Sequence, residues 1–114
     1  MIKKSAQMRT ETRSGIRGGN GDIKLLHIFE AEEMLDKSQF FAHMHIPVGG
    51  SVGKHVHDSD IGILLIMKGV ALVDDNGTAC TLSAGDAMFT GSGEYHSIAN
   101  AGDIPLEIIG IVLK

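Results

Sequence analysis

The chain of 114 residues contains no tryptophan, only two prolines and a single cysteine, and 4% of its residues are aromatic. Because one cysteine cannot form a disulfide within the chain, the fold does not depend on the cross-links of small secreted proteins. No apolar run reaches the roughly 18 residues that a membrane-spanning helix needs. The first residues carry charges but no apolar segment typical of a signal peptide. We therefore expect a cytoplasmic protein with no membrane partner.

An excess of positive charge is also missing, since the formal net charge is −4 and no basic patch is visible. Proteins that bind nucleic acids neutralise phosphates with clustered lysines and arginines, so we expect no nucleic-acid partner. The sequence is instead rich in glycine, with 15 residues, and 43% of it is hydrophobic. Many glycines among short apolar runs predict a single all-β domain with many turns.

Short apolar runs separated by turn residues predict a series of strands. We expect strands at 39–46, 55–57, 61–68, 70–74, 78–82, 87–90, 94–99 and 106–113. The pair Asn76-Gly77 accepts positive φ angles and predicts a tight hairpin. The pattern of residues 23–30 allows a helix or a strand, and residues 30–37 are interpreted as a connection with one helical turn.

Three histidines form the most informative pattern. His55 and His57 are separated by one residue, so on an extended strand their side chains share a face. His96 lies in a later glycine-rich stretch. Neutral imidazole is the commonest metal ligand, but an isolated His-x-His pair is also consistent with two partly exposed strand residues.

The spacing around these histidines resembles the two motifs of the cupin superfamily. The first motif is matched by Gly49, His55, His57 and Gly69, and the second by Gly85, Gly93, His96 and Asn100. Two positions depart from it, because Gly62 stands where the first motif has glutamate and Gly91 where the second has proline. The lead RGGNGD before the first expected strand also looks like one group of small single-domain cupins.

This resemblance implies an all-β jelly-roll barrel, the double-stranded β-helix of cupins. It favours a strand at 23–30 and divides the chain into an N-terminal arm with a Gly-rich loop, residues 1–22, and a cupin barrel, residues 23–114. Residues 1–14 are expected either to join a partner's sheet or to be a frayed terminus. The resemblance also implies that His55, His57 and His96 bind a divalent metal.

The absent glutamate at Gly62 bears on the chemistry of that site. Three neutral imidazoles leave the metal charge uncompensated and keep a coordination position open, which favours a small anionic ligand. Imidazole ligation suits Zn, Fe, Ni or Cu, while Mn, which the family also uses, is less favoured. Asp60 is either a fourth ligand or a solvated turn residue. We expect Gly62→Glu to restore a fourth ligand.

Other residues are interpreted as structural. His27, His43 and His45 are expected at the surface, Cys80 in the core, and Met44, Met67 and Met88 along the barrel lining. Glu94 is expected to cap a turn, and Lys54 and Tyr95 to point outward.

Two functions remain open at this point, and catalytic residues are not assigned. The first is a metalloenzyme acting on a small carboxylate or enediol as a dioxygenase, decarboxylase or isomerase; the second is a non-catalytic module that binds or senses a small molecule or a metal. The stretch 106–113 is apolar on both strand faces, so one face lines the barrel and the other needs a cover. We therefore expect a homodimer.

Overall fold

The computed structural model describes all 114 residues and consists of strands joined by turns and three short 3-10 helices. The strands are β1 (Arg9–Ser14), β2 (Asp22–His27), β3 (Ser38–Ile46), β4 (Ser51–Val56), β5 (Ile61–Lys68), β6 (Val70–Asp75), β7 (Thr78–Ser83), β8 (Ala87–Thr90), β9 (Tyr95–Asn100) and β10 (Leu106–Leu113). The 3-10 helices are η1 (Ser5–Gln7), η2 (Ile16–Gly18) and η3 (Glu32–Met34). None of the helices has the length and apolar character needed to cross a bilayer.

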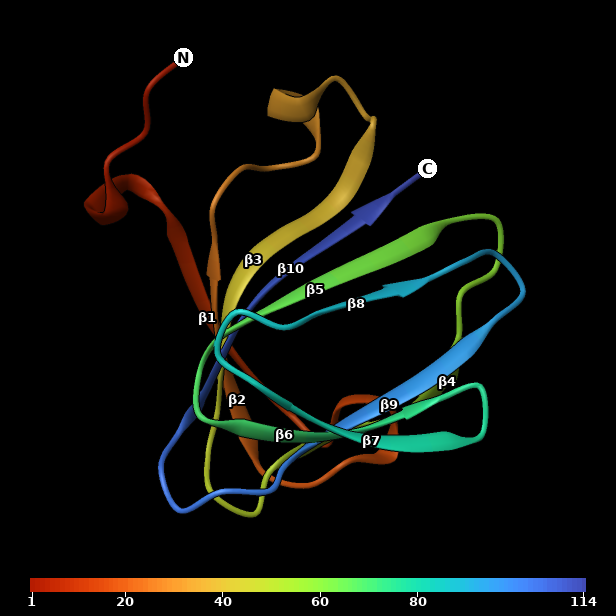
Figure 1. Cartoon of the computed structure of the whole chain (residues 1–114). Coiled ribbons are helices and arrows are strands. Elements are labelled where there is room, and N and C mark those ends of the chain that lie inside the picture. The colour runs from red at the N-terminus through yellow and green to blue at the C-terminus, as the bar shows by residue number, and fades with distance from the viewer.

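The strands form two antiparallel sheets that face each other (Figure 1). The larger sheet has the order β1-β2-β3-β10-β5-β8, and the smaller has the order β4-β9-β6-β7. Strand β10 therefore lies between β3 and β5, far from both in the sequence. This is the expected all-β jelly roll, and the stretch expected at 23–30 contributes a strand, β2, which ends earlier, at His27. Asn76 and Gly77 have φ angles of 51° and 94°, as the predicted hairpin requires.

The core lies between the sheets and receives every second side chain of the central strands. On β3, Ala42, Met44 and Ile46 are buried, while His43 and His45 point to the outer face. Ile46, Ile66 and Ile108 are fully buried. Each such side chain contributes roughly 1.5–3 kcal/mol from burial, so the two sheets are held together chiefly by this layer.

Residues 9–14 form the edge strand β1, which pairs with β2 of the same chain from Arg9↔His27 to Ser14↔Asp22. This is neither of the two arrangements expected for residues 1–14. The strand places Arg13 at the cavity, while Glu11 contacts the buried His27 and Thr10 and Thr12 lie on the outer side of the larger sheet.

Two core assignments made from the sequence are wrong. Cys80 is exposed, because β7 is the edge strand of the smaller sheet and covers little of the core. Met67 is 50% exposed, because it lies on the outer face of β5, next to the inward-facing Ile66. The other two methionines, Met44 and Met88, are buried in the core as expected.

Candidate metal centre

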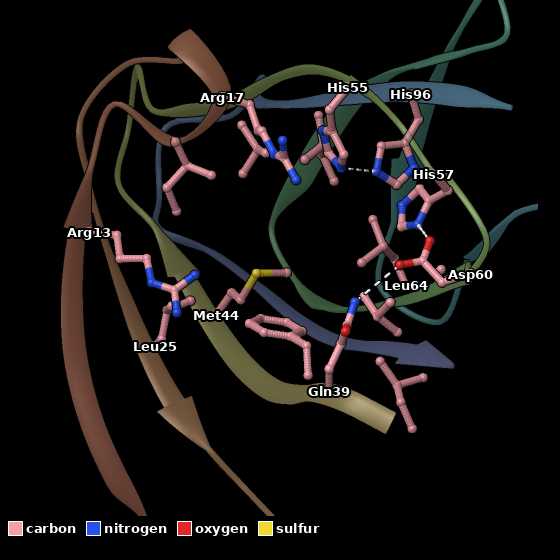
Figure 2. A pocket seen from close by; sticks show the side chains of 18 of the residues that line it. Arg13, Arg17, Leu25, Gln39, Met44, His55, His57, Asp60, Leu64 and His96 are labelled. Carbon is pink, nitrogen blue, oxygen red and sulfur yellow. Dashed lines mark hydrogen bonds and ion pairs between the residues drawn. The ribbon is translucent and has the colours of Figure 1, made fainter. Parts of the chain in front are cut away.

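The smaller sheet brings the three motif histidines together. His55 on β4 is paired directly with His96 on β9, and His57 follows β4 by one residue. Their side-chain nitrogens all lie within 4.8 Å of one another. His57 and His96 are 7% and 4% exposed, so this cluster lies inside the barrel, at one end of a cavity (Figure 2).

Each of the three rings is held through its Nδ1 atom. His55 Nδ1 lies 2.9 Å from the carbonyl oxygen of Gly53, and His57 Nδ1 lies 2.9 Å from Asp60 Oδ1. His96 Nδ1 lies 2.6 Å from the hydroxyl of the fully buried Thr90. Because a carbonyl and a carboxylate only accept hydrogen bonds, His55 and His57 donate from Nδ1 and present unprotonated Nε2 atoms.

The Nε2 atoms make a cluster that suits a cation. His55 Nε2 and His96 Nε2 are 3.0 Å apart, and His57 Nε2 is buried without any hydrogen-bond partner. A buried unpaired acceptor costs about 1–3 kcal/mol, so His57 is poorly satisfied by the protein alone. Nitrogen ligands around one metal at about 2.0–2.1 Å lie roughly 3 Å apart, which is the separation of the His55 and His96 Nε2 atoms.

Burial lowers the pKa of His55 and of His96 and so keeps these two imidazoles neutral, the state in which they bind metals. Burial, reinforced by His55 and His57, lowers the pKa of His96 from 6.5 to about 4. The pKa of His55 is lowered mainly by burial, with a further contribution from His57 and Arg17. At neutral pH a cation therefore meets little competition from protons at these two rings.

Asp60 is not among the converging groups. Its Oδ1 contacts the Nδ1 side of His57, and its Oδ2 accepts a hydrogen bond of 3.1 Å from Gln39 Nε2 (Figure 2). The carboxylate is partly buried, with 16% of its side chain exposed, so it is not a solvated turn residue either. Asp60 therefore orients His57 and places a negative charge one ring away from the nitrogen cluster.

Gly62 lies under the ring of His57. A Cβ at this position would come within 2.7 Å of His57 Cε1 and 2.8 Å of its Nε2. Position 62 thus faces the site, as the motif spacing predicts, but the imidazole fills the space that a side chain would occupy. A glutamate there would displace His57 before it could add a ligand, so the expected restoration of a fourth ligand does not follow.

The cavity beyond the histidines has a volume of about 320 Å³. Its apolar lining residues come from both sheets and include Met44, Val52, Leu64 and Ile98. Two arginines, Arg13 and Arg17, line the side opposite His57 (Figure 2). The cavity therefore combines a nitrogen cluster, an apolar wall and two cationic groups.

Sequence reasoning missed both arginines. Arg17 belongs to the RGGNGD segment, which was interpreted only for its glycines. The positive charge of its arginine was the signal that could have identified it. Arg17 has a left-handed backbone, with a φ of 53°, in the loop that carries η2. A Cβ at Gly19 would collide with the Ser51 carbonyl, and one at Gly53 with the Arg17 carbonyl. These glycines therefore let the loop pack against β4, which fixes Arg17 near His55.

The remaining candidates lie away from the cavity. Lys54 Nζ sits 4.2 Å above the Tyr95 ring, and neither residue lines the cavity. Glu94 Oε1 accepts a hydrogen bond of 2.5 Å from the Gly91 backbone and so caps that turn. His27 is only 5% exposed and bonds to Glu11, so it is not the surface residue expected from the sequence. His43 and His45 lie on the outer face of the larger sheet.

Known proteins resemble this chain in sequence. The model of the cupin domain family matches residues 42–112. An oxalate-binding protein from Thermotoga maritima is 38% identical over 113 residues, which cover 99% of this chain and 93% of that protein. A Streptomyces glaucescens protein, the tetracenomycin polyketide synthase protein TcmJ, is 31% identical over 63% of this chain and 48% of its own length.

Solved structures show the same fold. A crystal structure described as a predicted oxalate decarboxylase from Thermotoga maritima superposes with a TM-score of 0.94 at 38% identity, covering 99% of this chain and 98% of that one. An RmlC-like cupin from Shewanella frigidimarina gives a TM-score of 0.77 at 16% identity, covering 98% and 88% of the two chains, and supports the fold alone. With the family match, the relative of nearly full length and the shared fold, this chain belongs to the cupin domain family.

Proposed function

We propose that this cupin binds a small dicarboxylate of the oxalate class through a divalent transition metal held by His55, His57 and His96. The observation that carries the proposal is the convergence of three Nε2 atoms in one cavity that also receives Arg17. The oxalate-binding relative supports the choice of ligand class. A cavity of about 320 Å³ is at the small end of ligand sites, which span about 300–1,000 Å³.

The charges around the cavity favour an anion. Three neutral imidazoles leave the metal with its full positive charge, and Asp60 is the one carboxylate that lines the cavity. Arg13 donates a hydrogen bond of 2.8 Å to Glu11, which offsets part of its charge. Arg17 makes no ion pair with the protein. It is therefore the guanidinium available to a carboxylate, which it can bind through two parallel hydrogen bonds.

The donor set determines which metals fit. Imidazole nitrogen suits Zn, Fe, Ni and Cu, and Mn remains in the set with lower preference. When bound, such an ion supplies a Lewis acid with open positions for carboxylate oxygens. Leu64, Met44 and the other apolar lining residues then exclude water from the carbon skeleton of the ligand.

The contacts that Asp60 already makes favour binding without turnover over catalysis. Decarboxylation of a dicarboxylate must deliver a proton to the carbon that loses CO₂, so it needs a positioned donor. Asp60, the cavity's one carboxyl group, is already engaged by His57 and Gln39. A metal-dependent lyase acting on the same ligand is the second candidate, and the coordination positions that three imidazoles leave free on a metal are the feature that favours it.

Calorimetric titration tests the proposal. Protein prepared without a His tag and stripped of metal is loaded with Zn²⁺ or Fe²⁺, and oxalate is then added, with acetate as the monocarboxylate control. We expect oxalate to bind only to loaded protein and more tightly than acetate. Arg17→Ala should weaken oxalate binding by roughly tenfold or more without changing metal affinity, while the exposed Lys37→Ala should change neither. Equal oxalate binding with and without metal would contradict the proposal, and release of CO₂ would select the lyase.

We also propose that two copies associate through the outer face of the larger sheet. Apolar side chains from β3, β10, β5 and β8 point outward there: Phe41, Ile63, Leu65, Met67, Phe89, Ile109 and Ile111. Leu65, Met67 and Phe89 are 38%, 50% and 58% exposed. A contiguous exposed patch of this kind is typical of an interface, and a two-fold dimer covers both copies at once.

A further inference from the structure

A second group of ligand-type side chains lies outside the barrel, on the outer face of the larger sheet. His43 and His45 come from β3, and Glu107 comes from the neighbouring β10, where it is paired directly with His45. One ligand atom from each residue lies within 4.8 Å of the others. Both β3 and β10 are central strands of the larger sheet, so the backbone that carries all three residues is rigid.

The distances within this cluster match those between ligands of one metal ion. Glu107 Oε1 lies 3.1 Å from His43 Nε2 and 3.3 Å from His45 Nε2. Nitrogen and oxygen ligands at about 2.0–2.2 Å from a metal, at tetrahedral or octahedral angles, lie roughly 3 Å apart. The rings of His43 and His45 are 4.4 Å apart at 37° to each other, so both nitrogens are presented on the same side.

His43 is not satisfied by the protein. Its Nε2 is shut off from solvent and makes no hydrogen bond, although Glu107 Oε1 is within 3.1 Å. The nitrogen and the carboxylate are therefore close without the alignment of a donor and an acceptor. Atoms that ligate the same ion have this relation, because their lone pairs point at a shared centre and not at each other. The same signature, a buried unpaired Nε2, occurs at His57 in the barrel site.

We propose that His43, His45 and Glu107 form a second site for a divalent transition metal, separate from the barrel. Two imidazoles and one carboxylate suit Zn²⁺ or Fe²⁺ and leave other coordination positions free. His45 is 40% exposed in its side chain, so in the single chain the site opens to solvent. A second pocket, which has room for water on the metal, lies beside it and is lined by Thr10, Glu11, Thr12, Lys24, Leu25, Leu26 and His45.

This site is independent of the proposed oxalate site. Met44 lies between His43 and His45 in the sequence and points the opposite way, into the barrel cavity. The sheet therefore separates the two clusters. A metal at the outer site bridges β3 and β10, which are already paired along their whole length, so the fold does not depend on it.

Counting metal equivalents tests the proposal. Untagged protein is stripped with a chelator and titrated with Co²⁺, with absorption in the visible region and calorimetry as readouts, and Zn²⁺ is used for competition. We expect two equivalents per chain in the wild type. His45→Gln changes the most exposed member of the cluster and should weaken one of the two by at least about tenfold, without altering the circular dichroism spectrum. Glu107→Gln should act on the same equivalent.

The barrel variant His57→Ala separates this proposal from the previous one. It should remove the other equivalent, and the double variant His45→Gln with His57→Ala should bind none. A single equivalent that disappears in His57→Ala and persists in His45→Gln would overturn the outer site. A single equivalent with the reverse response would overturn the barrel site and leave the outer site standing.

Discussion

His57 and Asp60 form the contact on which the proposed metal centre depends, with His57 Nδ1 2.9 Å from Asp60 Oδ1. The two residues are only three positions apart, and Ser59 between them adopts a left-handed backbone with a φ of 66°. This turn brings the carboxylate back to the ring. The contact fixes the tautomer of His57 and turns its Nε2 toward His55 and His96.

The first prediction follows from this contact. Asp60→Asn keeps an oxygen that can accept from Nδ1 but removes the negative charge that makes the ring a stronger ligand. We expect metal affinity to fall by about 10–100-fold, measured by competition with a chromophoric chelator. Asp58→Asn is the matched control, because Asp58 is exposed. If the two variants bind metal equally, Asp60 has no role in the site.

The second prediction concerns the space under His57. Gly62→Ala places a Cβ within 2.7 Å of His57 Cε1, so the ring must move or the strands must shift. We expect a loss of about 1–3 kcal/mol in the free energy of unfolding, as for other overpacked sites, together with weaker metal binding. Both are measured on the same preparation, by denaturant unfolding and by metal titration.

Gly102→Ala is the control for that substitution, since the nearest atom to its Cβ would be 3.6 Å away, an ordinary contact. It should change neither quantity appreciably. Gly62→Glu should resemble Gly62→Ala or be worse. A variant Gly62→Glu with tighter metal binding would show that His57 can move aside, and would reinstate the fourth ligand.

The spacing of the motif histidines was sufficient to predict which residues meet, because His-x-His on a strand fixes a shared face and the second motif fixes the register. Apolar runs and turn residues placed most of the later strands close to where they are observed, but the strand expected at 55–57 is β4 at Ser51–Val56, so His57 lies just after it, and β1 was not predicted as a strand of this sheet. It did not reveal the Gly62–His57 packing, which depends on a rotamer, or the approach of Arg17, which depends on a loop crossing β4.

The wrong assignments have a common cause. Cys80 and Met67 lie in apolar runs, and a run shows that a strand is present without showing which side is covered. Only the sheet order places β7 at an edge and the Met67 face outside the barrel. The expectation for His27 was wrong in the opposite direction. His27 is buried and contacts Glu11 on β1, in a segment that was expected to join a partner's sheet or to fray.

The third prediction is a pH dependence of stability. A hydrogen bond from Arg13, and then one from His27, lowers the pKa of Glu11 from 4.5 to about 2. A carboxyl group with a lowered pKa in the fold stabilises it fully above the unfolded value and ceases to do so as the pH falls through the folded value. The stabilisation that Glu11 gives the fold should therefore be complete above about pH 4.5 and be lost as the pH falls from about 4.5 to about 2.

Glu11→Gln tests this. Because Glu11 is partly exposed, we expect a loss of about 1 kcal/mol in the free energy of unfolding at pH 6. The difference from the wild type should shrink as the pH is lowered from 4.5 to 2.5. Urea unfolding at each pH measures it, and Glu32→Gln, which removes an exposed carboxylate without an ion pair, is the control. A difference that stays constant with pH would mean that the charge of Glu11 does not matter.

The last prediction concerns the outer face of the larger sheet. The wild type should sediment at equilibrium with twice the mass of the 12.1 kDa chain at low micromolar concentration. Phe89→Lys puts a charge in the apolar patch, and because Phe89 is already 58% exposed the substitution costs the single chain little. Burying that lysine between two copies would require removing it from water, so the dimer should dissociate at least about tenfold more readily.

Leu72→Lys is the matched control, since Leu72 is 46% exposed on the outer face of the smaller sheet. If Leu72→Lys produces monomers and Phe89→Lys does not, the copies meet through the smaller sheet; a wild-type monomer contradicts the dimer altogether.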